Sequence, residues 1–308
     1  MKKYSNLIIV ILSFTTLILI FLNKTLISKT VITSFGIWFN TLVPSMFPMF
    51  ILSDILINYN FIEFIPKNIV KFISKIFNVS DNAVLIIFLS MLSGFPTNAI
   101  NIKTSYDANL ISKEEAEHLL LFNHFANPLF VLQTIGIFYL NNNTYGIIIL
   151  ISHILSNIII GIIFRNNNHY SLNNYISKSS KSQSFGNVLS SSIKNTINSL
   201  LMISGTITLF LILSTLIVTV FSLSSRNSLL IQAILEMTTS IAKLSLFNIN
   251  DIFKVVFATM IISFGGLSIH LQVISSLDDK IRYKNYFIGR IYQTIISGII
   301  SFLLMFIM

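Results

Sequence analysis

The chain has 308 residues, of which 54% are hydrophobic and only 10% charged, and its formal net charge is +9. Soluble domains carry roughly 25% charged residues, so this composition excludes a soluble globule and an intrinsically disordered chain. The absence of cysteine excludes a disulfide framework, a thiol nucleophile and a cysteine-built zinc site. We expect an all-α fold, a polytopic transmembrane helical bundle that crosses the cell membrane several times.

The basic residues are scattered between apolar blocks rather than gathered on one face. Lys67, Lys71 and Lys75 form one such group, and Lys280, Arg282 and Lys284 form another. This distribution is typical of loops that face anionic lipid under the positive-inside rule. A nucleic-acid-binding protein would need a basic face on a soluble fold. The sequence therefore predicts the lipid bilayer as a partner and no nucleic acid.

Windows without Asp, Glu, Lys or Arg mark the expected spans, because a helix needs about 20 apolar residues to cross the bilayer. These windows are 4–23, 30–53, 82–102, 118–164, 195–225, 255–277 and 291–308. The window 118–164 is long enough for two spans joined at residues 141–144. The pattern predicts about eight spans, and a weaker ninth segment lies at 229–247.

The N-terminal apolar run could be a signal peptide, since it follows Lys2 and Lys3. It lacks a small-residue cleavage site before Lys24, and another span follows soon after. We interpret residues 1–30 as an N-terminal transmembrane anchor.

Two polar segments separate the apolar blocks. In 61–77, Glu63 and three lysines recur every four residues, which predicts a helix lying in the membrane interface. A short linker helix between spans is the alternative. The Asn- and Ser-rich segment 165–195 is interpreted as a polar linker between the two halves of the chain.

The two halves resemble each other. Asp81 lies twelve residues before Ser93, and Asp251 lies twelve residues before Ser263, where each apolar run is interrupted by small residues. We predict two repeated units with broken or re-entrant helices, a common construction in transporters. Their ranges are 31–164 and 196–308. Chance similarity between apolar stretches is the alternative.

The topology of the first unit has two solutions. If residues 82–126 are re-entrant, the linker 165–195 shares a side with the N-terminus and the two repeats are inverted. If 82–102 and 119–140 both span fully, the acidic stretch 103–118 lies outside, but 165–195 then faces the side that the positive-inside rule disfavours. We favour the re-entrant arrangement.

Two backbone breaks are expected at membrane depth. Gly94 and Pro96 interrupt the run 93–98, and Gly265 and Gly266 interrupt the second. Pro removes a backbone donor, and freed backbone groups inside a membrane need partners or a cavity to line. Half-helices that begin at such breaks direct backbone N–H groups at a polar solute. A packing kink is the alternative.

Two further polar features lie in apolar surroundings. Asn123 and Asn127 are expected one helical turn apart on one face beside His124, with Pro128 disrupting that helix. They would line a cavity or form a helix–helix hydrogen bond. Glu236 follows a largely apolar run and is a candidate cation site, proton relay or hydrogen-bond anchor. In an interfacial helix it would simply face water.

These observations define the candidate site. The residues expected to contact solute are Ser93, Thr97, Asn98, Asn123, Asn127, Glu236, Thr238, Thr239, Ser268 and Gln272. The residues expected to shape the helix breaks are Gly94, Pro96, Pro128, Gly265 and Gly266. The motifs HExxH, GxSxG, GxxxxGK[ST] and GxGxxG are absent, so we expect no enzymatic activity, no metal and no cofactor.

The order of several motifs carries a family resemblance. Residues 44–48 (PSMFP), 93–96 (SGFP), 127–130 (NPLF), 235–240 (LEMTTS) and 263–268 (SFGGLS) resemble those of the YlbJ-type sporulation integral membrane proteins of endospore-forming Firmicutes. The resemblance implies a role in spore formation and membership of the gate or nucleoside-recognition superfamily. That superfamily is similar to concentrative nucleoside transporters, which have re-entrant hairpins at the substrate site.

Two functions fit the sequence. The first is a secondary transporter or permease of a small polar solute, nucleoside-like if the resemblance extends that far, coupled to sodium or protons. The second is a non-transporting membrane scaffold or signalling factor for spore cortex or coat assembly, with 61–77 and 165–195 as partner or lipid surfaces.

Overall fold

The computed structural model describes residues 2–59, 61–165 and 184–307, and this part of the chain is helical without any strand. The prediction of an all-α fold is confirmed. In chain order the elements are α1 (Lys2–Leu22), α2 (Lys24–Ile37), η1 (Trp38–Leu42), α3 (Val43–Asn58), η2 (Phe61–Phe64), α4 (Lys67–Phe77), α5 (Asp81–Ser93), α6 (Thr97–Asp107), α7 (Lys113–Phe122), η3 (Phe130–Tyr139), α8 (Asn143–Ile163), α9 (Phe185–Val220), α10 (Ser225–Leu235), α11 (Met237–Ser245), α12 (Asp251–Phe264), α13 (Gly266–Leu277) and α14 (Lys284–Leu304).

The described residues contain five helical segments that are long and apolar enough to cross a membrane. They are Lys24–Asn58, Asn143–Ile163, Phe185–Val220, Asp251–Leu277 and Lys284–Leu304. The pair α4 and α5 would make a sixth, although the two helices are bent by 93°. The chain is therefore a multi-pass membrane protein embedded in the lipid bilayer.

Five or six spans are fewer than the eight expected, because several apolar windows do not form continuous helices. The window 82–102 is divided between α5 and α6, and the segment 123–127 has no regular structure. A helix rises about 1.5 Å per residue, so each of these pieces falls short of the roughly 30 Å hydrocarbon layer.

Both polar segments differ in detail from the prediction. The segment 61–77 is divided by Pro66 into η2 and α4, because proline has no N–H to continue a helix. The lysines of α4 are exposed as expected. In the predicted linker 165–195, residues 166–183 lie outside the described residues, while Phe185 onward is already part of α9.

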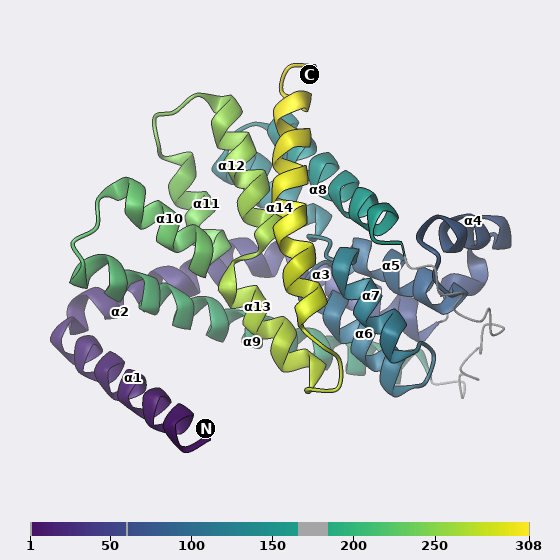
Figure 1. Cartoon of the computed structure of the whole chain (residues 1–308), viewed down its shortest axis with the longest axis horizontal. Helices are drawn as coiled ribbons and strands as arrows, with labels where there is room; N and C mark the ends of the chain where they lie inside the picture. The colour runs from purple at the N-terminus through teal and green to yellow at the C-terminus, as the bar shows by residue number, and fades with distance from the viewer. Residues whose placement is uncertain (1, 60, 166–183, 308) are drawn as a thin grey trace.

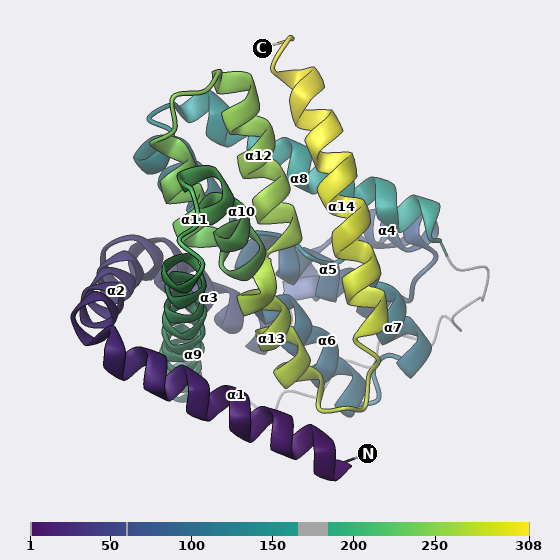
Figure 2. The same ribbon diagram turned by 60° about the vertical axis from the view of Figure 1, so that its left-hand side comes forward.

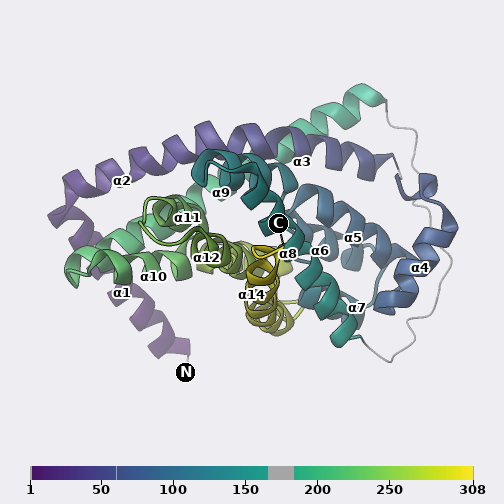
Figure 3. The ribbon, with the colours of Figure 1, turned by 90° about the horizontal axis from the view of Figure 1, so that it is seen from above.

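The helices are arranged around a central pair. In Figure 1, α12 and α14 run side by side in the middle of the molecule, and they are in extensive contact. Figure 2 shows α1 along the lower edge of the molecule, where it contacts α2 and α9. Seen from above in Figure 3, α2 and α3 form one long rod that α9 crosses, and both contact α9.

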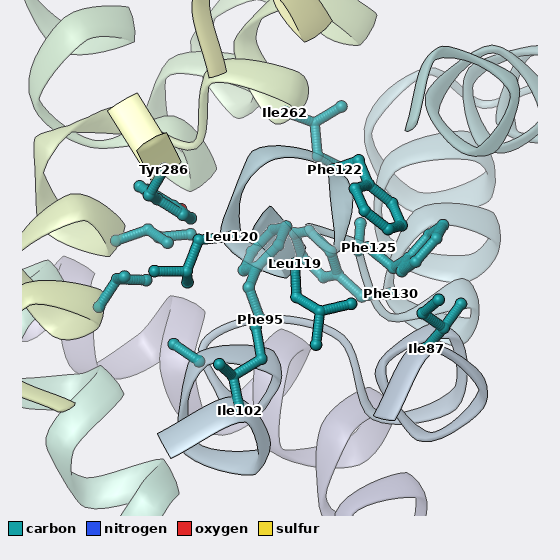
Figure 4. Packing of buried hydrophobic residues seen from close by; sticks show 14 of the residues in the cluster. Ile87, Phe95, Ile102, Leu119, Leu120, Phe122, Phe125, Phe130, Ile262 and Tyr286 are labelled. Atoms are coloured by element: carbon teal, nitrogen blue, oxygen red, sulfur yellow. The ribbon is translucent and has the colours of Figure 1, made fainter. Parts of the chain in front are cut away.

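The core is built where short helices meet the central pair. Figure 4 shows aromatic and aliphatic side chains of α5, α6, α7 and the segment 123–127 gathered in one cluster. Phe95, Phe122 and Phe130 are almost completely buried there. Burial of apolar area contributes roughly 25 cal/mol per Å² in water, but inside a membrane the fit between these side chains matters more than their hydrophobicity. The core therefore fixes the backbone breaks that lie beside it.

Candidate functional site

One cavity brings together residues from three interruptions of the helices. Its lining residues are Leu42, Met46, Phe95, Pro96, Ile203, Ile207, Glu236, Met237, Thr238, Ser268, Ile269 and Gln272. Its empty volume of about 290 Å³ includes space open to the surroundings, and only about 20 Å³ of it can hold the centre of a water-sized sphere. Three places therefore meet at this cavity: the break between α5 and α6, the break between α10 and α11, and the first turns of α13. They lie up to about 170 residues apart in sequence.

Glu236 is held in the cavity wall as the N-cap of α11. Its backbone is extended (φ −147°, ψ 116°), which ends α10 and starts α11. Its carboxylate accepts hydrogen bonds from Thr238 N (2.9 Å) and Thr239 N (2.7 Å), and the Thr239 hydroxyl donates a third at 2.7 Å. Amide donors at a helix start stabilise a carboxylate. No Lys, Arg or His nitrogen of the described chain lies within ion-pair distance of Glu236.

Two polar side chains of α13 leave oxygen atoms without a hydrogen-bond partner at the cavity. Ser268 and Gln272 are both buried. Gln272 Nε2 donates to the Thr206 hydroxyl of α9 at 2.5 Å, whereas Gln272 Oε1 and Ser268 Oγ have no partner among the residues that the structure describes. A buried polar atom without a partner is unfavourable by about 1–3 kcal/mol, so these two oxygens are available for a further hydrogen bond.

Gly94 lies at the first break. Gly94 has φ +77°, and a Cβ atom at this position would lie 2.3 Å from Asn127 N. Only glycine permits both the positive φ and this approach. Pro96 follows a cis peptide bond with Phe95 and precedes the first residue of α6. The break therefore packs directly on the segment 123–127.

The second break is also at the predicted glycines. α12 ends at Phe264 and α13 begins at Gly266, while Gly265 and Gly266 have φ of +87° and +69°. A Cβ atom at Gly266 would lie 3.3 Å from Glu236 Cα. The second break is therefore in direct contact with the α10–α11 break that carries Glu236.

The predicted helix through Asn123 and Asn127 is wrong. α7 ends at Phe122, residues 123–127 are irregular, and the helix that follows begins at Pro128. Pro128 therefore starts a helix instead of disrupting one, because the first helical position requires no N–H donor. Asn127 is the cap of this helix, since its Oδ1 accepts from Phe130 N at 3.1 Å.

Asparagine side chains bind the irregular segment to the first break. Asn98 Nδ2 donates to the carbonyls of Asn123 and Phe125, each at 3.2 Å. Asn123 Nδ2 donates to the Ser90 hydroxyl at 2.8 Å, and Asn127 Nδ2 donates to the Ser93 carbonyl at 3.3 Å. These side chains replace the backbone hydrogen bonds that the interrupted helices lack.

The ten candidate solute contacts therefore fall into two groups. Glu236, Thr238, Ser268 and Gln272 line the cavity. The others surround the breaks without lining it: the Ser93 hydroxyl donates to Leu89 O, Thr239 binds Glu236, and Thr97 is the first residue of α6. Asn98, Asn123 and Asn127 belong to the hydrogen bonds just described.

A second group of buried polar residues, on α8, α14 and the irregular segment 123–127, was not predicted. The carbonyl oxygen of His124 lies 2.7 Å from Asn157 Nδ2 and 3.0 Å from His153 Nε2, both on α8. The Tyr286 hydroxyl of α14 lies 3.1 Å from His124 Nδ1. Arg290 of α14 is fully buried and donates to Leu121 O at 3.1 Å. The hydrogen-bonded pairs of this cluster are separated by 29 to 169 residues, although His153 and Asn157 of α8, and Tyr286 and Arg290 of α14, each lie one helical turn apart.

A metal centre has no support in the part of the chain that the structure describes, where no three His, Asp or Glu side chains are placed to share an ion. The polar groups of the cavity are hydroxyl, amide and carboxylate oxygens.

Comparison with known proteins gives one informative match. The chain is 25% identical to the sporulation integral membrane protein YlbJ of Bacillus subtilis (strain 168) over 309 aligned positions, which cover 88% of this chain and 76% of that protein. The two are distant homologues. No protein-family model matches the chain, and no solved structure matches it.

Proposed function

We propose that the chain is a sporulation-associated membrane permease, a secondary transporter of a small polar solute. The observation that carries this proposal is the convergence of three helix breaks on one cavity. The cavity has a buried carboxylate and two oxygens that have no partner in the described part of the chain. Broken helices at a polar central site are the usual construction of secondary transporters. The association with sporulation is inferred from the homologue's name.

A feature shared by the two halves of the chain supports the proposal that they are repeated gate-like units. In each half a helix begins at an aspartate, Asp81 or Asp251, directly after a residue whose side chain caps it. Each of these helices ends at a glycine with positive φ, Gly94 or Gly265. We therefore propose 31–164 and 196–308 as repeats, of which α6 and α13 are the equivalent second helices.

Glu236, Thr238, Ser268 and Gln272 are the proposed solute contacts. The carboxylate of Glu236 would accept hydrogen bonds from the solute, and the free Gln272 Oε1 would accept another. The remainder of the wall is largely apolar, with Met46, Met237 and Ile269 among its residues. We propose coupling to a sodium or proton gradient and no enzymatic activity.

Uptake into proteoliposomes tests the proposal. The purified full chain would be assayed with nucleosides and other small polar metabolites, with and without sodium and proton gradients. We expect saturable uptake of at least one solute and a loss of about tenfold or more in Glu236→Gln, since each 1.4 kcal/mol of lost binding is tenfold. Glu114→Gln, at an exposed position in the first turn of α7, is the matched control and should transport normally. The absence of saturable flux for every solute would refute the permease.

A non-transporting scaffold is the second candidate, and α4 favours it. This helix is bent 93° from α5 and exposes Lys67, Lys71, Lys75 and Phe72, as expected of a helix lying on a membrane surface or on a partner. Both ideas can be separated in a spore-forming host that depends on this chain. If Glu236→Gln sporulates normally while reversal of the three lysine charges does not, the scaffold is correct.

A further inference from the structure

The wall of the cavity contains one charged side chain, and no basic side chain faces it. Glu236 is 1% exposed and is the charged member of the lining residues, which include no Lys, Arg or His in the part of the chain that the structure describes. The ion pairs found among the described residues do not involve Glu236 either. The wall therefore has a negative charge that no positive side chain balances.

The hydrogen bonds of Glu236 favour its ionised form. Oε1 accepts from Thr238 N, and Oε2 accepts from the amide and the hydroxyl of Thr239; donors to a carboxylate stabilise its charge. Burial acts in the opposite direction, because a charge without a counter-ion is unfavourable away from water. A cation beside Glu236 would offset this effect. A carboxylate has about four acceptor positions, so these three hydrogen bonds leave room for one more donor.

Two further acceptors lie on α13, next to the break that carries Glu236. Ser268 Oγ and Gln272 Oε1 have no partner among the described residues, and residues four apart share one face of a helix. The first residue of α13 packs on Glu236, since a Cβ atom at Gly266 would lie 3.3 Å from Glu236 Cα. The same cavity wall therefore offers three acceptors: one carboxylate position, one hydroxyl oxygen and one amide oxygen.

These acceptors match the donors of a particular chemical group. A protonated primary amine has three N–H donors, a positive charge and no acceptor. A hydroxyl group has a single donor and no charge, so it would leave the charge of Glu236 without compensation. A carboxylate or phosphate group would be repelled by Glu236. The polar part of the wall therefore favours an ammonium group over the other common polar groups of small solutes.

The rest of the wall favours a short carbon chain. Eight of the twelve lining residues are apolar, and they come mainly from η1, α3, α9 and the first break. One face of the Phe95 ring stacks on His124, with ring centroids 4.6 Å apart, so the cavity meets the edge or the other face of that ring. A bare metal ion would make no favourable contact with such a wall. The narrow space in the cavity restricts the carbon chain to a few atoms.

We propose that the solute of this site is a small protonated primary amine. Its ammonium group binds Glu236, Ser268 and Gln272, and its carbon chain lies against the apolar wall. A nucleoside, which carries several uncharged hydroxyl groups, matches this wall less well. The inference rests on the proposed function for the transport of the amine, whereas binding of the amine can be measured without transport.

Thermal unfolding of the purified full chain in detergent tests binding. The probe is propylamine hydrochloride at about pH 7, where a primary amine with a pKa of about 10 is protonated. A ligand that binds only the folded state raises the unfolding midpoint, and we expect a saturable rise of about 3 °C or more. Sodium chloride, tetramethylammonium chloride and propanol are the comparison probes. They supply a metal cation, a cation without N–H donors and an uncharged chain of the same length, and each should raise the midpoint less than propylamine.

Two substitutions identify the groups responsible. Glu236→Gln removes the charge, so the affinity for propylamine should fall about tenfold or more. Ser268→Ala removes an oxygen that has no partner, so the midpoint without amine should not fall, while the affinity should fall about threefold or more. This second variant keeps the test valid if Glu236→Gln, which alters a helix cap, fails to fold. Ser192→Ala in α9 is the matched control, because it removes another buried hydroxyl without a partner at a position outside the cavity wall. It should bind propylamine as the parent chain does.

The outcomes separate this inference from the permease. If propylamine raises the midpoint through Glu236 and Ser268 while no solute is transported, the permease is refuted and the amine site stands. If uptake of an uncharged or anionic solute is saturable while propylamine leaves the midpoint unchanged, the amine site is refuted and the permease stands. An equal rise with sodium chloride or tetramethylammonium chloride, or an unchanged affinity in Ser268→Ala, also overturns the amine site.

Discussion

Gly94 lies directly against the backbone of Asn127, so close that a Cβ atom on Gly94 would be 2.3 Å from the Asn127 nitrogen. The Asn127 side chain completes the contact, because its Nδ2 donates to the carbonyl of Ser93 at 3.3 Å. The last residue of the irregular segment thus closes the first helix break. The cavity wall formed by Phe95 and Pro96 depends on this contact.

Gly94→Ala should destabilise the protein strongly. The methyl group would overlap the Asn127 backbone, which cannot move aside as a flexible side chain can, and φ +77° is unfavourable for alanine. Strain and overpacking together should lower stability by about 3 kcal/mol or more. The midpoint of thermal unfolding in detergent measures the effect. Gly205→Ala is the control, since a Cβ atom there meets nothing within 4 Å. Equal midpoints for the two variants would contradict the contact.

Asn127→Ala should also lower stability, by less than Gly94→Ala does. It leaves Phe130 N without its cap and the Ser93 carbonyl without its donor, both in a buried place. The loss of these two hydrogen bonds, with both partners still buried, should lower the free energy of unfolding by about 2 kcal/mol. Asn142→Ala removes a cap from α8 at the protein surface, where water replaces the side chain, and should lower the unfolding midpoint less. The reverse order would show that Asn127 is not a structural anchor.

The helix breaks could be predicted because their residues have strong local preferences. Gly94, Pro96 and the pair at 265–266 are poor helix formers in any context, and the structure breaks at each of them. Glu236 could be singled out because a carboxylate in an apolar run requires compensation. In the structure that compensation comes from backbone amides of α11.

The segment 123–127 could not be predicted, because its conformation depends on distant partners. Asn123, His124 and Phe125 have no strong preference against a helix, and Pro128 is compatible with the end of one helix or the start of the next. Hydrogen bonds from Asn98 and Asn157 decide the outcome. The number of spans was overestimated for the same reason, since composition shows apolar windows but not the tertiary contacts that interrupt them.

An ion-pair cluster joins the far ends of α6 and α13 and should make stability depend on pH. Lys103 binds Asp107 and lies 3.7 Å from Asp278, and Lys280 lies 3.3 Å from Asp107. The hydrogen bond from Lys103 lowers the pKa of Asp107 below its usual value, and the same bond raises the pKa of Lys103. The cluster therefore stabilises the pairing of the two helices while both groups are charged.

The signs of these shifts define the pH window. The contribution of Asp107 is complete above its unfolded pKa of about 4 and is lost as the pH falls through its lowered folded pKa. The contribution of Lys103 is complete below its unfolded pKa and is lost as the pH rises through the raised one. Asp107→Asn should lower the unfolding midpoint modestly at pH 7, and the difference should shrink as the pH falls below about 4 and through the lowered folded pKa. Because Asp107 is solvent-accessible, high salt should shrink the difference. A difference that persists at low pH would contradict the ion pair.

Two glycines of α14 test how this helix packs. A Cβ atom at Gly289 would lie 1.9 Å from the carbonyl oxygen of Leu121, at the C-terminal end of α7, whereas at Gly298 it would lie 2.9 Å from the side chain of Met260. A backbone carbonyl cannot yield, but a methionine side chain adopts other rotamers readily. Gly289→Ala should therefore lower stability by about 3 kcal/mol or more, and Gly298→Ala by about 1 kcal/mol or less. The Gly289 variant should also separate Arg290 from Leu121 O, the carbonyl to which it donates. Unfolding midpoints of the two variants in one detergent give the comparison, and a Gly298 variant that is the less stable of the two would overturn the close α7–α14 contact.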